Sequence, residues 1–321
     1  MPARLLFRAF GDVNLGRAVG QELLKGNVDY PFEHVRDFLH EADLVFVNLE
    51  SQLTDQGGET QHPKDHFVFC GPPSGASSLK RANILVVSTA NNHAYDYGKR
   101  ALRETITSLG REGITVVGTT HDSLSLSPPV VVVKNGIRLG FVAYTEFVNS
   151  NGKWQGWIST FDRKRAKREI DSLRKVADVV VASYHGGKEY DDEPQKFTLA
   201  QLRFLSDAGA HIVLGHHPHV PQGVEVRDDK LIFYSLGNFV FYQPQRYWTQ
   251  IGLAVDILFE KRDNAVSIHS TRLIPVRAGK QPTFTVNTPE RTLLFERLQR
   301  LSNVTIDQQD NFFLLQSSLR E

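Results

Sequence analysis

Short runs of Val, Ile, Leu and Phe alternate with longer segments of helical period, and this alternation constrains the fold more than any other feature of the sequence. Such a pattern is typical of βα units, in which helices cover a sheet that is buried on its faces. We expect strands at residues 4–10, 43–48, 84–89, 114–117, 130–134, 137–144, 178–184 and 211–214. We expect helices at 31–40, 98–112, 162–176 and 195–208. The sequence therefore predicts an α/β protein.

The pattern changes after residue 220, where paired apolar runs flank short polar turns. Runs 224–226 and 231–234 flank Asp228-Asp229, and runs 251–259 and 265–271 flank Asp263-Asn264. Both pairs are typical of β-hairpins. Helical spacing returns from Pro289 to about Leu301. We therefore expect a main domain over residues 1–275 and a C-terminal extension over 276–321 whose helix packs on that domain.

The composition excludes several classes of protein. A hydrophobic content of 40% in 321 residues supports a sizeable core. Lys and Arg (37) nearly balance Asp and Glu (36), so no bulk field favours nucleic acid, and we expect the basic run 163–168 to be a solvated helix face. The single cysteine, Cys70, excludes an internal disulfide and a Cys-rich metal site. No apolar stretch is long enough to cross a bilayer, so we expect no membrane contact from this sequence.

Polar residues that can bind metal follow almost every apolar strand in the first two thirds of the chain. They are Asp12, Glu50, Asn92, His93, Asp96, His185, His216, His217 and His219. Ligands of open α/β sheets bind in the crevice outside the carboxyl ends of the strands. Carboxylates, an amide and imidazoles form the mixed nitrogen and oxygen set that Zn, Fe or Mn favours. The sequence therefore predicts a metal site at this edge.

Each of these residues also has an ordinary structural explanation. Asp12 fits a helix N-cap, Glu50 a solvated turn, and Asn92 a turn in left-handed backbone. The tract from His216 to His219 is the most specific single signal, because short His-rich tracts are typical of metal sites and Pro218 restricts the backbone between two imidazoles. All the structural explanations must hold together to exclude a metal, so the set favours the metal site.

Six motifs in order resemble the CapA-type capsule-biosynthesis proteins, also called poly-γ-glutamate synthesis accessory proteins, a branch of the calcineurin-like metallophosphoesterases. The motifs are G-D-x-x-x-G, N-L-E, N-N-H-x-x-D-x-G, H-G-G-x-E-Y, G-x-H-P-H and Y-S-L-G-N-F, and they run from about Leu5 to Tyr242. The resemblance implies a four-layer α-β-β-α sandwich with two divalent metal ions, Mn, Zn or Fe, at one edge.

The resemblance also implies roles for individual residues. Asp12 and His219 would hold one metal, Asn92, His185 and His217 the other, and Glu50 would lie between them. His93 would be the catalytic acid, and Asp96 would orient its ring. A bridging carboxylate can hold two cations about 3.5–4 Å apart.

The sequence departs from the broader phosphoesterase pattern at two places. Asn14 stands where that pattern has a histidine, which removes a strong ligand from one metal, and Gly186 stands in place of an aromatic residue, which would widen the substrate pocket. Four residues are candidates for contacts with substrate or with the ligands: Asn14, Glu189, His216 and Asn238. For His216 we favour a solvated position, and a strand-end turn explains Asn238 equally well.

The leading hypothesis is a metal-dependent hydrolase, most simply of phosphoesters, acting on a small-molecule or polymer substrate. An amide hydrolase acting on glutamyl peptides and a non-catalytic accessory protein for polymer synthesis are the alternatives. Loss of a ligand at Asn14 favours the accessory role, whereas His93 beside Asn92 favours catalysis. Family members are often membrane-anchored and face outside, but no anchor is recognised here, so we expect a cytoplasmic protein without a nucleic-acid partner.

Overall fold

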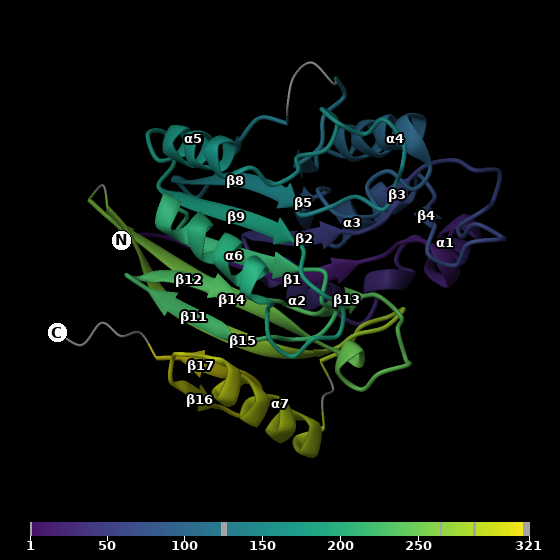
Figure 1. Ribbon diagram of the computed structural model, residues 1–321. Helices are drawn as coiled ribbons and strands as arrows, with labels where there is room; N and C mark the ends of the chain where they lie inside the picture. Colours follow the sequence, from purple (N-terminus) through teal and green to yellow (C-terminus); the bar gives the residue numbers. More distant parts are fainter. Residues whose placement is uncertain (1, 123–126, 264, 285–286, 317–321) are drawn as a thin grey trace.

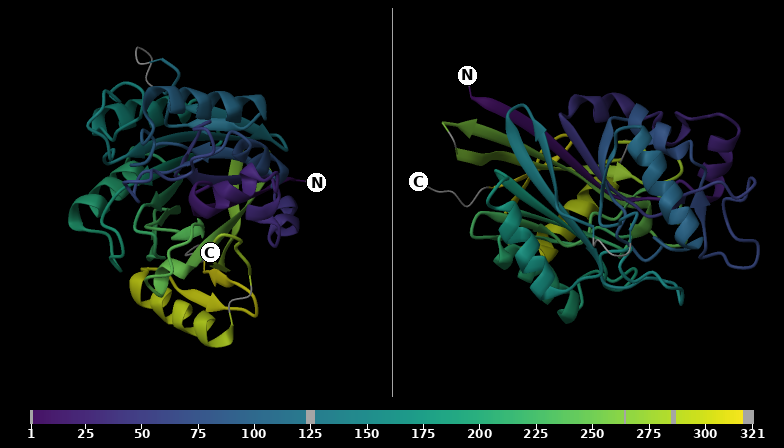
Figure 2. Two further views of the ribbon diagram at one scale, coloured as in Figure 1. Left: turned by 90° about the vertical axis from the view of Figure 1, so that its right-hand side faces the viewer. Right: turned by 90° about the horizontal axis from the view of Figure 1, so that it is seen from above.

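The computed structural model describes residues 2–122, 127–263, 265–284 and 287–316. Two β-sheets pack face to face, and helices cover their outer faces (Figures 1 and 2). This arrangement confirms the four-layer α-β-β-α sandwich. Within the described residues, every helix is too short or too polar to span a lipid bilayer.

The first sheet has the strand order β16-β17-β15-β14-β1-β2-β5-β6, with β13 also paired to β1. Its strands are β1 (Ala3–Val13), β2 (Leu44–Leu49), β5 (Ile84–Ser88), β6 (Thr115–Val117), β13 (Asn238–Val240), β14 (Ile251–Arg262), β15 (Ala265–Arg277), β16 (Ile306–Gln308) and β17 (Phe313–Leu315). Strands β1, β2, β5 and β6 are parallel, so their carboxyl ends meet at one edge.

The second sheet has the order β11-β12-β10-β9-β8-β7. Its strands are β7 (Val130–Lys134), β8 (Ile137–Thr145), β9 (Val179–His185), β10 (Ile212–His216), β11 (Val224–Arg227) and β12 (Lys230–Phe233). Strands β8, β9, β10 and β12 are parallel, and in Figure 1 the arrowheads of β8 and β9 point to the same side as those of β1 and β2. The two sheets therefore bring the ends of their parallel strands to a common rim.

Apolar residues fill the space between the layers. The inter-sheet core contains Phe7 and Phe46 from the first sheet and Phe141 and Phe233 from the second, all at most 1% exposed. A second cluster lies between the first sheet and α1, α2, α3 and α4, and a third between the second sheet and α5 and α6. These helices are α1 (Arg17–Leu24), α2 (Arg36–Glu41), α3 (Gly75–Arg81), α4 (Gly98–Arg111), α5 (Arg163–Leu173) and α6 (Lys196–Ala208).

All the expected strands are present, and the three longer expected helices are confirmed as α4, α5 and α6. The helix expected at 31–40 is wrong in part: a 3-10 turn, η1 (Tyr30–Phe32), precedes the shorter α2. Helices α1 and α3, with eight and seven residues, were not predicted because so few turns give little periodic signal. The basic run is not wholly solvated, since Arg165 is 8% exposed and donates from Nε to Glu169 Oε1 at 2.7 Å.

Both expected hairpins are confirmed, as β11–β12 and β14–β15, although Asn264 in the second turn lies outside the described residues. Beyond β15, helix α7 (Thr288–Leu301) places Leu294 and Leu298 in the inter-sheet core, and β16 and β17 extend the first sheet. Short strands β3 (Gln52–Leu53) and β4 (Cys70–Gly71) and the 3-10 turn η2 (Trp248–Gln250) complete the described elements.

Candidate metal centre

Asp12 reaches the rim at the end of β1 because the preceding glycine allows another segment to approach. A Cβ atom at Gly11 would lie 1.7 Å from Gly237 O, so a side chain there would displace the backbone hydrogen bond from Asp12 N to Gly237 O (3.0 Å). This contact aligns Asn238 with Asp12 in the β1–β13 register. Asn238 Oδ1 then lies 2.9 Å from His219 Nδ1. Asn238 therefore orients a candidate ligand.

Asn48, at the end of β2, connects several of the candidate ligands. Its Nδ2 lies 2.8 Å from Asp12 Oδ1, 3.1 Å from His185 Nδ1 and 3.5 Å from Glu50 Oε2. Asn91 Nδ2 in turn donates to Asn48 Oδ1 at 3.2 Å and fixes the orientation of that amide. Two side-chain amides therefore hold an acidic cluster that lies between the two sheets.

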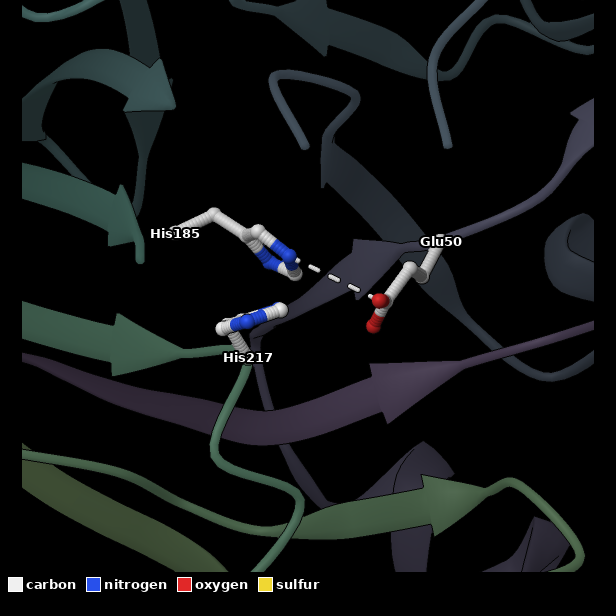
Figure 3. A group of neighbouring side chains, drawn as sticks. All are labelled: Glu50, His185 and His217. Atoms are coloured by element: carbon white, nitrogen blue, oxygen red, sulfur yellow. Dashed lines mark ion pairs between the residues drawn. The ribbon is translucent and has the colours of Figure 1, made fainter. Parts of the chain in front are cut away.

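Glu50 follows β2 and is completely buried. Its Oε1 lies 3.5 Å from His185 Nε2 and 3.7 Å from His219 Nε2 (Figure 3 shows the contact with His185). His185 Nε2 also lies 2.7 Å from Asn92 Oδ1, in the loop that follows β5. The carboxylate thus lies between imidazoles that come from β9 and from the loop after β10.

The backbone of the His tract is strained where it turns away from β10. His217 has φ +96° and His219 has φ +58°, with Pro218 between them. Such conformations are costly for residues with a Cβ atom and are typical of functional sites. They direct both imidazoles toward the rim, with ring centres 5.9 Å apart, and His217 lies 4.9 Å from the ring of His185. The edge of Phe147 covers His217 at 5.0 Å.

Three overlapping groups among the described residues have ligand atoms within 4.8 Å of one another. They are Asp12, Glu50 and His219; Glu50, His185 and His217; and Glu189, His217 and His219. Glu50 belongs to two of them, which is the position expected of a carboxylate between two metals. The structure therefore brings together the six residues proposed as metal ligands, with Asn92 joined through His185 and Glu189 adjacent.

Burial and neighbouring charges shift the pKa values of the candidate ligands in directions that show which charges need a partner. Burial and the nearby charge of Asp12 raise the pKa of Glu50 well above its usual value, so its carboxylate is destabilised without a partner. Burial opposes ionisation of Asp12, but the nearby imidazoles of His216 and His219 outweigh it and hold its pKa well below the usual range. Burial lowers the pKa of His185 and brings that of His217 to about 4, which keeps both rings in the neutral form that metals bind.

Buried oxygen and nitrogen atoms without hydrogen-bond partners show whether the residues fit a metal. Asp12 Oδ2, Glu50 Oε1 and His217 Nδ1 are buried and have no hydrogen-bond partner among the described residues. Asp12 Oδ2 lies 3.0 Å from His219 Nδ1, but the two groups are not aligned for a hydrogen bond. Buried polar atoms are normally paired. Oxygen and imidazole atoms left in this state fit divalent cations of the Zn, Mn or Fe type.

His93 lies beside the cluster and is 6% exposed. Its Nδ1 lies 2.8 Å from Asp96 Oδ2, and its ring packs 4.2 Å from that of Phe69. Burial raises the pKa of Asp96, although the hydrogen bond to His93 partly opposes the shift. The predicted pairing of these two side chains is therefore present in the structure, through Nδ1 of the imidazole.

One candidate, His216, differs from expectation, and the surroundings of Asn14 and Gly186 are also defined. His216 is not solvated: it is 1% exposed, its Nδ1 lies 3.5 Å from Asp12 Oδ1, and β10 carries it between the sheets. Asn14 accepts a hydrogen bond from Gly16 N (2.8 Å), and no side-chain hydrogen bond joins it to a candidate ligand within the described ranges. Gly186 lies against Glu146, since a Cβ atom there would lie 2.5 Å from Glu146 Oε2, and the wider pocket stays a prediction.

The sequence analysis assigned no role to several residues that the structure places at the site. Asn48 and Asn91 hold the ligands, and Phe69 and Phe147 cover the imidazoles. Phe147 lies in the segment that follows β8, and Phe69 immediately precedes β4. A polar Asn at the end of an otherwise apolar strand was a usable signal for Asn48, whereas the aromatic residues carried none.

Comparison with known proteins shows the family. The family model described as "Bacterial capsule synthesis protein PGA_cap" matches residues 7–243. PGA biosynthesis protein CapA of Bacillus subtilis is 30% identical over 280 residues, covering 83% of this chain and 72% of the relative. Capsule biosynthesis protein CapA of Bacillus anthracis is 29% identical over 290 residues, covering 86% and 68%. The chain belongs to this CapA family of capsule synthesis proteins, as the motifs predicted.

A solved structure shows the same fold. The putative 5'-nucleotidase from Staphylococcus aureus, crystallised with alpha-ketoglutarate, aligns with a TM-score of 0.52 at 13% identity. The alignment covers 92% of this chain and 58% of the nucleotidase. At this identity the likeness concerns the sandwich alone, which it confirms for the present chain.

Proposed function

We propose that this CapA-family protein is a metal-dependent hydrolase of phosphoesters. The observation that supports it best is the group of buried, unpaired donor atoms on Asp12, Glu50 and His217, which meet at the common rim of two sheets. Leaving such atoms unpaired lowers stability, and a bound divalent cation would offset that cost. We assign Asp12 and His219 to one metal, Asn92, His185 and His217 to a second, and Glu50 to a position between them.

The chemistry of the site follows from this assignment. Divalent cations, when bound, acidify a water and neutralise charge on the phosphoryl oxygens. The chain contributes the positions of the ligands, because Asn48 and Asn238 orient the carboxylates and imidazoles. It also excludes bulk water, since the candidate ligands Asp12, Glu50 and His185 have no measurable exposure.

His93 is proposed as the general acid. Asp96 Oδ2 accepts from its Nδ1, and in the imidazolium form Nε2 carries the proton that would pass to the leaving oxygen. The ring of Phe69 fixes the orientation of the imidazole. A site with a purely structural metal has no use for this oriented pair, so His93 and Asp96 favour catalysis over the accessory role.

The test begins with turnover of aryl phosphate monoesters and diesters. We expect the protein to lose activity in a chelator and to regain it on addition of Mn²⁺ or Zn²⁺, and we expect His217→Ala to remain inactive after metal addition. Full turnover after complete chelation would contradict the metal dependence. Bound metal without turnover of any ester would favour the accessory role, and cleavage of a glutamyl amide instead would identify the amide hydrolase.

His93→Ala separates the acid from the ligands. We expect kcat to fall about 10²- to 10⁴-fold with an alkyl leaving group, at unchanged metal content. With 4-nitrophenolate, which needs little protonation, the loss should be much smaller. His34→Ala, at an exposed position, is the matched control. Equal losses with both leaving groups would contradict the role of His93 as an acid.

A further inference from the structure

A half-buried arginine lies beside the candidate metal centre. Arg17 is the first residue of α1, and its guanidinium carbon lies 4.5 Å from the ring centre of Phe69 and 5.7 Å from that of Phe241. These two rings also contact the site, because Phe69 packs 4.2 Å from His93 and Phe241 packs 4.8 Å from His219. The guanidinium therefore lies against the aromatic residues that support a proposed acid and a proposed ligand.

The backbone at Arg17 is held in an unusual conformation. Its φ is +53°, in the left-handed region that is costly for a residue with a Cβ atom. Two hydrogen bonds to one residue fix it: Arg17 N donates to Thr60 O at 2.9 Å, and Thr60 Oγ1 donates to Arg17 O at 2.8 Å. Strain that the surrounding structure maintains in this way is typical of functional positions.

The donors of Arg17 are only partly used. Nη2 donates to the backbone oxygen of His66 at 2.9 Å, whereas Nε is buried without a hydrogen-bond partner among the residues that the structure describes. Burial lowers the pKa of Arg17, and the negative charge of Glu50 opposes that shift. The charges of Asp96 and Glu189 also act on the guanidinium, and no ion pair joins either of them to it in the described part of the chain. Arg17 is thus a cation near the centre with donors available for a ligand.

We propose that Arg17 binds the anionic oxygen atoms of the substrate, and that this substrate is a phosphate ester. This inference rests on the proposed hydrolase of phosphoesters and names the residue that would bind its substrate. The planar fork of a guanidinium matches two phosphate oxygens, and its charge strengthens both hydrogen bonds. Cations held by Asp12 and Glu50 would remove the competing negative charge. A phosphate ester supplies charged oxygen acceptors for Nε and for a second donor of the guanidinium.

The experiment measures binding of inorganic phosphate to the Mn²⁺-loaded protein by calorimetry, with metal content determined for each variant. Arg17→Gln should weaken phosphate binding by on the order of 10- to 100-fold at unchanged metal content, because a charge-assisted contact is lost. Arg17→Lys keeps the charge but not the fork, and it should weaken binding by a smaller factor. The kcat/KM for aryl phosphates should fall in the same order.

Arg103→Gln is the matched control. Arg103 also lies over an aromatic ring, 5.0 Å from the centre of Trp157, and donates to one backbone oxygen, that of His121. Its loss should leave phosphate affinity unchanged. If Arg17→Gln does not fold, Arg17→Lys decides the question alone, and unchanged affinity in that variant would overturn the proposal.

The remaining outcomes separate this inference from the proposed hydrolase. Wild-type affinity in Arg17→Gln, absence of phosphate binding by the metal-loaded wild type, or weaker binding that accompanies loss of metal would each overturn the role of Arg17. Phosphate binding that depends on Arg17 without turnover of any ester would refute the hydrolase and leave the anion site. Turnover that is independent of Arg17 would refute the anion site and leave the hydrolase.

Discussion

Two buried groups of charged residues share strand β1 and differ in how their charges are paired. At the middle of the strand, Arg8 Nε and Nη2 donate to Asp256 Oδ1 and Oδ2 at 2.6 and 2.8 Å, and Arg272 adds a further contact at 2.7 Å. The guanidinium of Arg8 also donates to Phe38 O and lies 3.2 Å from the Phe38 ring centre. Both carboxylate oxygens of Asp256 are therefore satisfied within the protein.

Four residues further along the strand, Asp12 lies in a cluster whose atoms are not satisfied. Asp12 Oδ2 and Glu50 Oε1 lack hydrogen-bond partners among the described residues, although both side chains are as buried as Arg8. A buried ion pair that is complete maintains the fold, whereas buried charges without partners indicate a ligand. The complete pair of Arg8 and Asp256 therefore stabilises the fold, whereas Asp12 and Glu50 indicate a ligand site in the same sheet.

Glu50→Gln should cause the largest loss of activity and should raise the thermal stability of the metal-free protein. We expect turnover to fall roughly 10³-fold, since the metal contribution that it removes is worth several kcal/mol. In a chelator the variant should unfold at a higher temperature than the wild type at pH 7.5. The folded-state pKa of Glu50 is raised, so its charge opposes folding above that pKa, and glutamine removes this cost. A lower melting temperature in the chelator would contradict the comparison.

Asp256→Asn should lower the stability of the protein and leave its activity unchanged. Breaking a buried pair leaves Arg8 incompletely paired, and the free energy of unfolding should fall by about 3–5 kcal/mol. Chemical denaturation measures this loss, and the folded variant should keep its metal content and turnover. The control is Asp171→Asn, which breaks the exposed pair with Lys167 and should cost about 0–1 kcal/mol. Loss of metal in Asp256→Asn would show that the two groups are coupled.

Acidification should destabilise the metal-free protein through His217. Burial places its pKa at about 4 in the folded state, against 6.5 for an ordinary histidine. The unfolded chain therefore binds the proton first, and stability present above pH 6.5 is lost as the pH falls toward 4, by up to about 3 kcal/mol for this residue. His217→Gln should flatten the profile of unfolding free energy over that interval. Identical profiles in the two proteins would contradict the assignment.

Asn48→Ala should produce the smallest effect. It removes the amide that contacts Asp12 and His185, so metal affinity should fall about 10- to 100-fold, as is usual when a residue that orients ligands is lost. Competition with a metal indicator measures the change. Asn303→Ala, which loses hydrogen bonds to the backbone of Val226 only, should keep the affinity of the wild type. Unchanged affinity in Asn48→Ala would mean that the ligands are held without it.

Much of the fold and most of the candidate site followed from local patterns. Strand β9 could be recognised as an apolar run that ends in His185, and the motif order predicted the family that the comparisons confirm. His216 was misplaced because a sequence does not show that the end of β10 lies between two sheets. Helix α1 was missed because its eight residues give weak periodicity, and with it the position of Arg17 beside Phe69.

The sequence by itself determined the chemical types of the ligands and their positions at the ends of strands, because alternation and strand-end residues are local properties of the chain. Only the tertiary structure decided which atoms are paired and which are not. Asp12 and Arg8 are both charged residues of β1, and nothing local shows which of the two finds a complete set of partners within the protein. The partner of Arg8 lies 248 residues away on β14, while the neighbours of Asp12 come from β2, β10 and the loop after it. Burial and pairing are set by such distant contacts, which form only when the two sheets pack together.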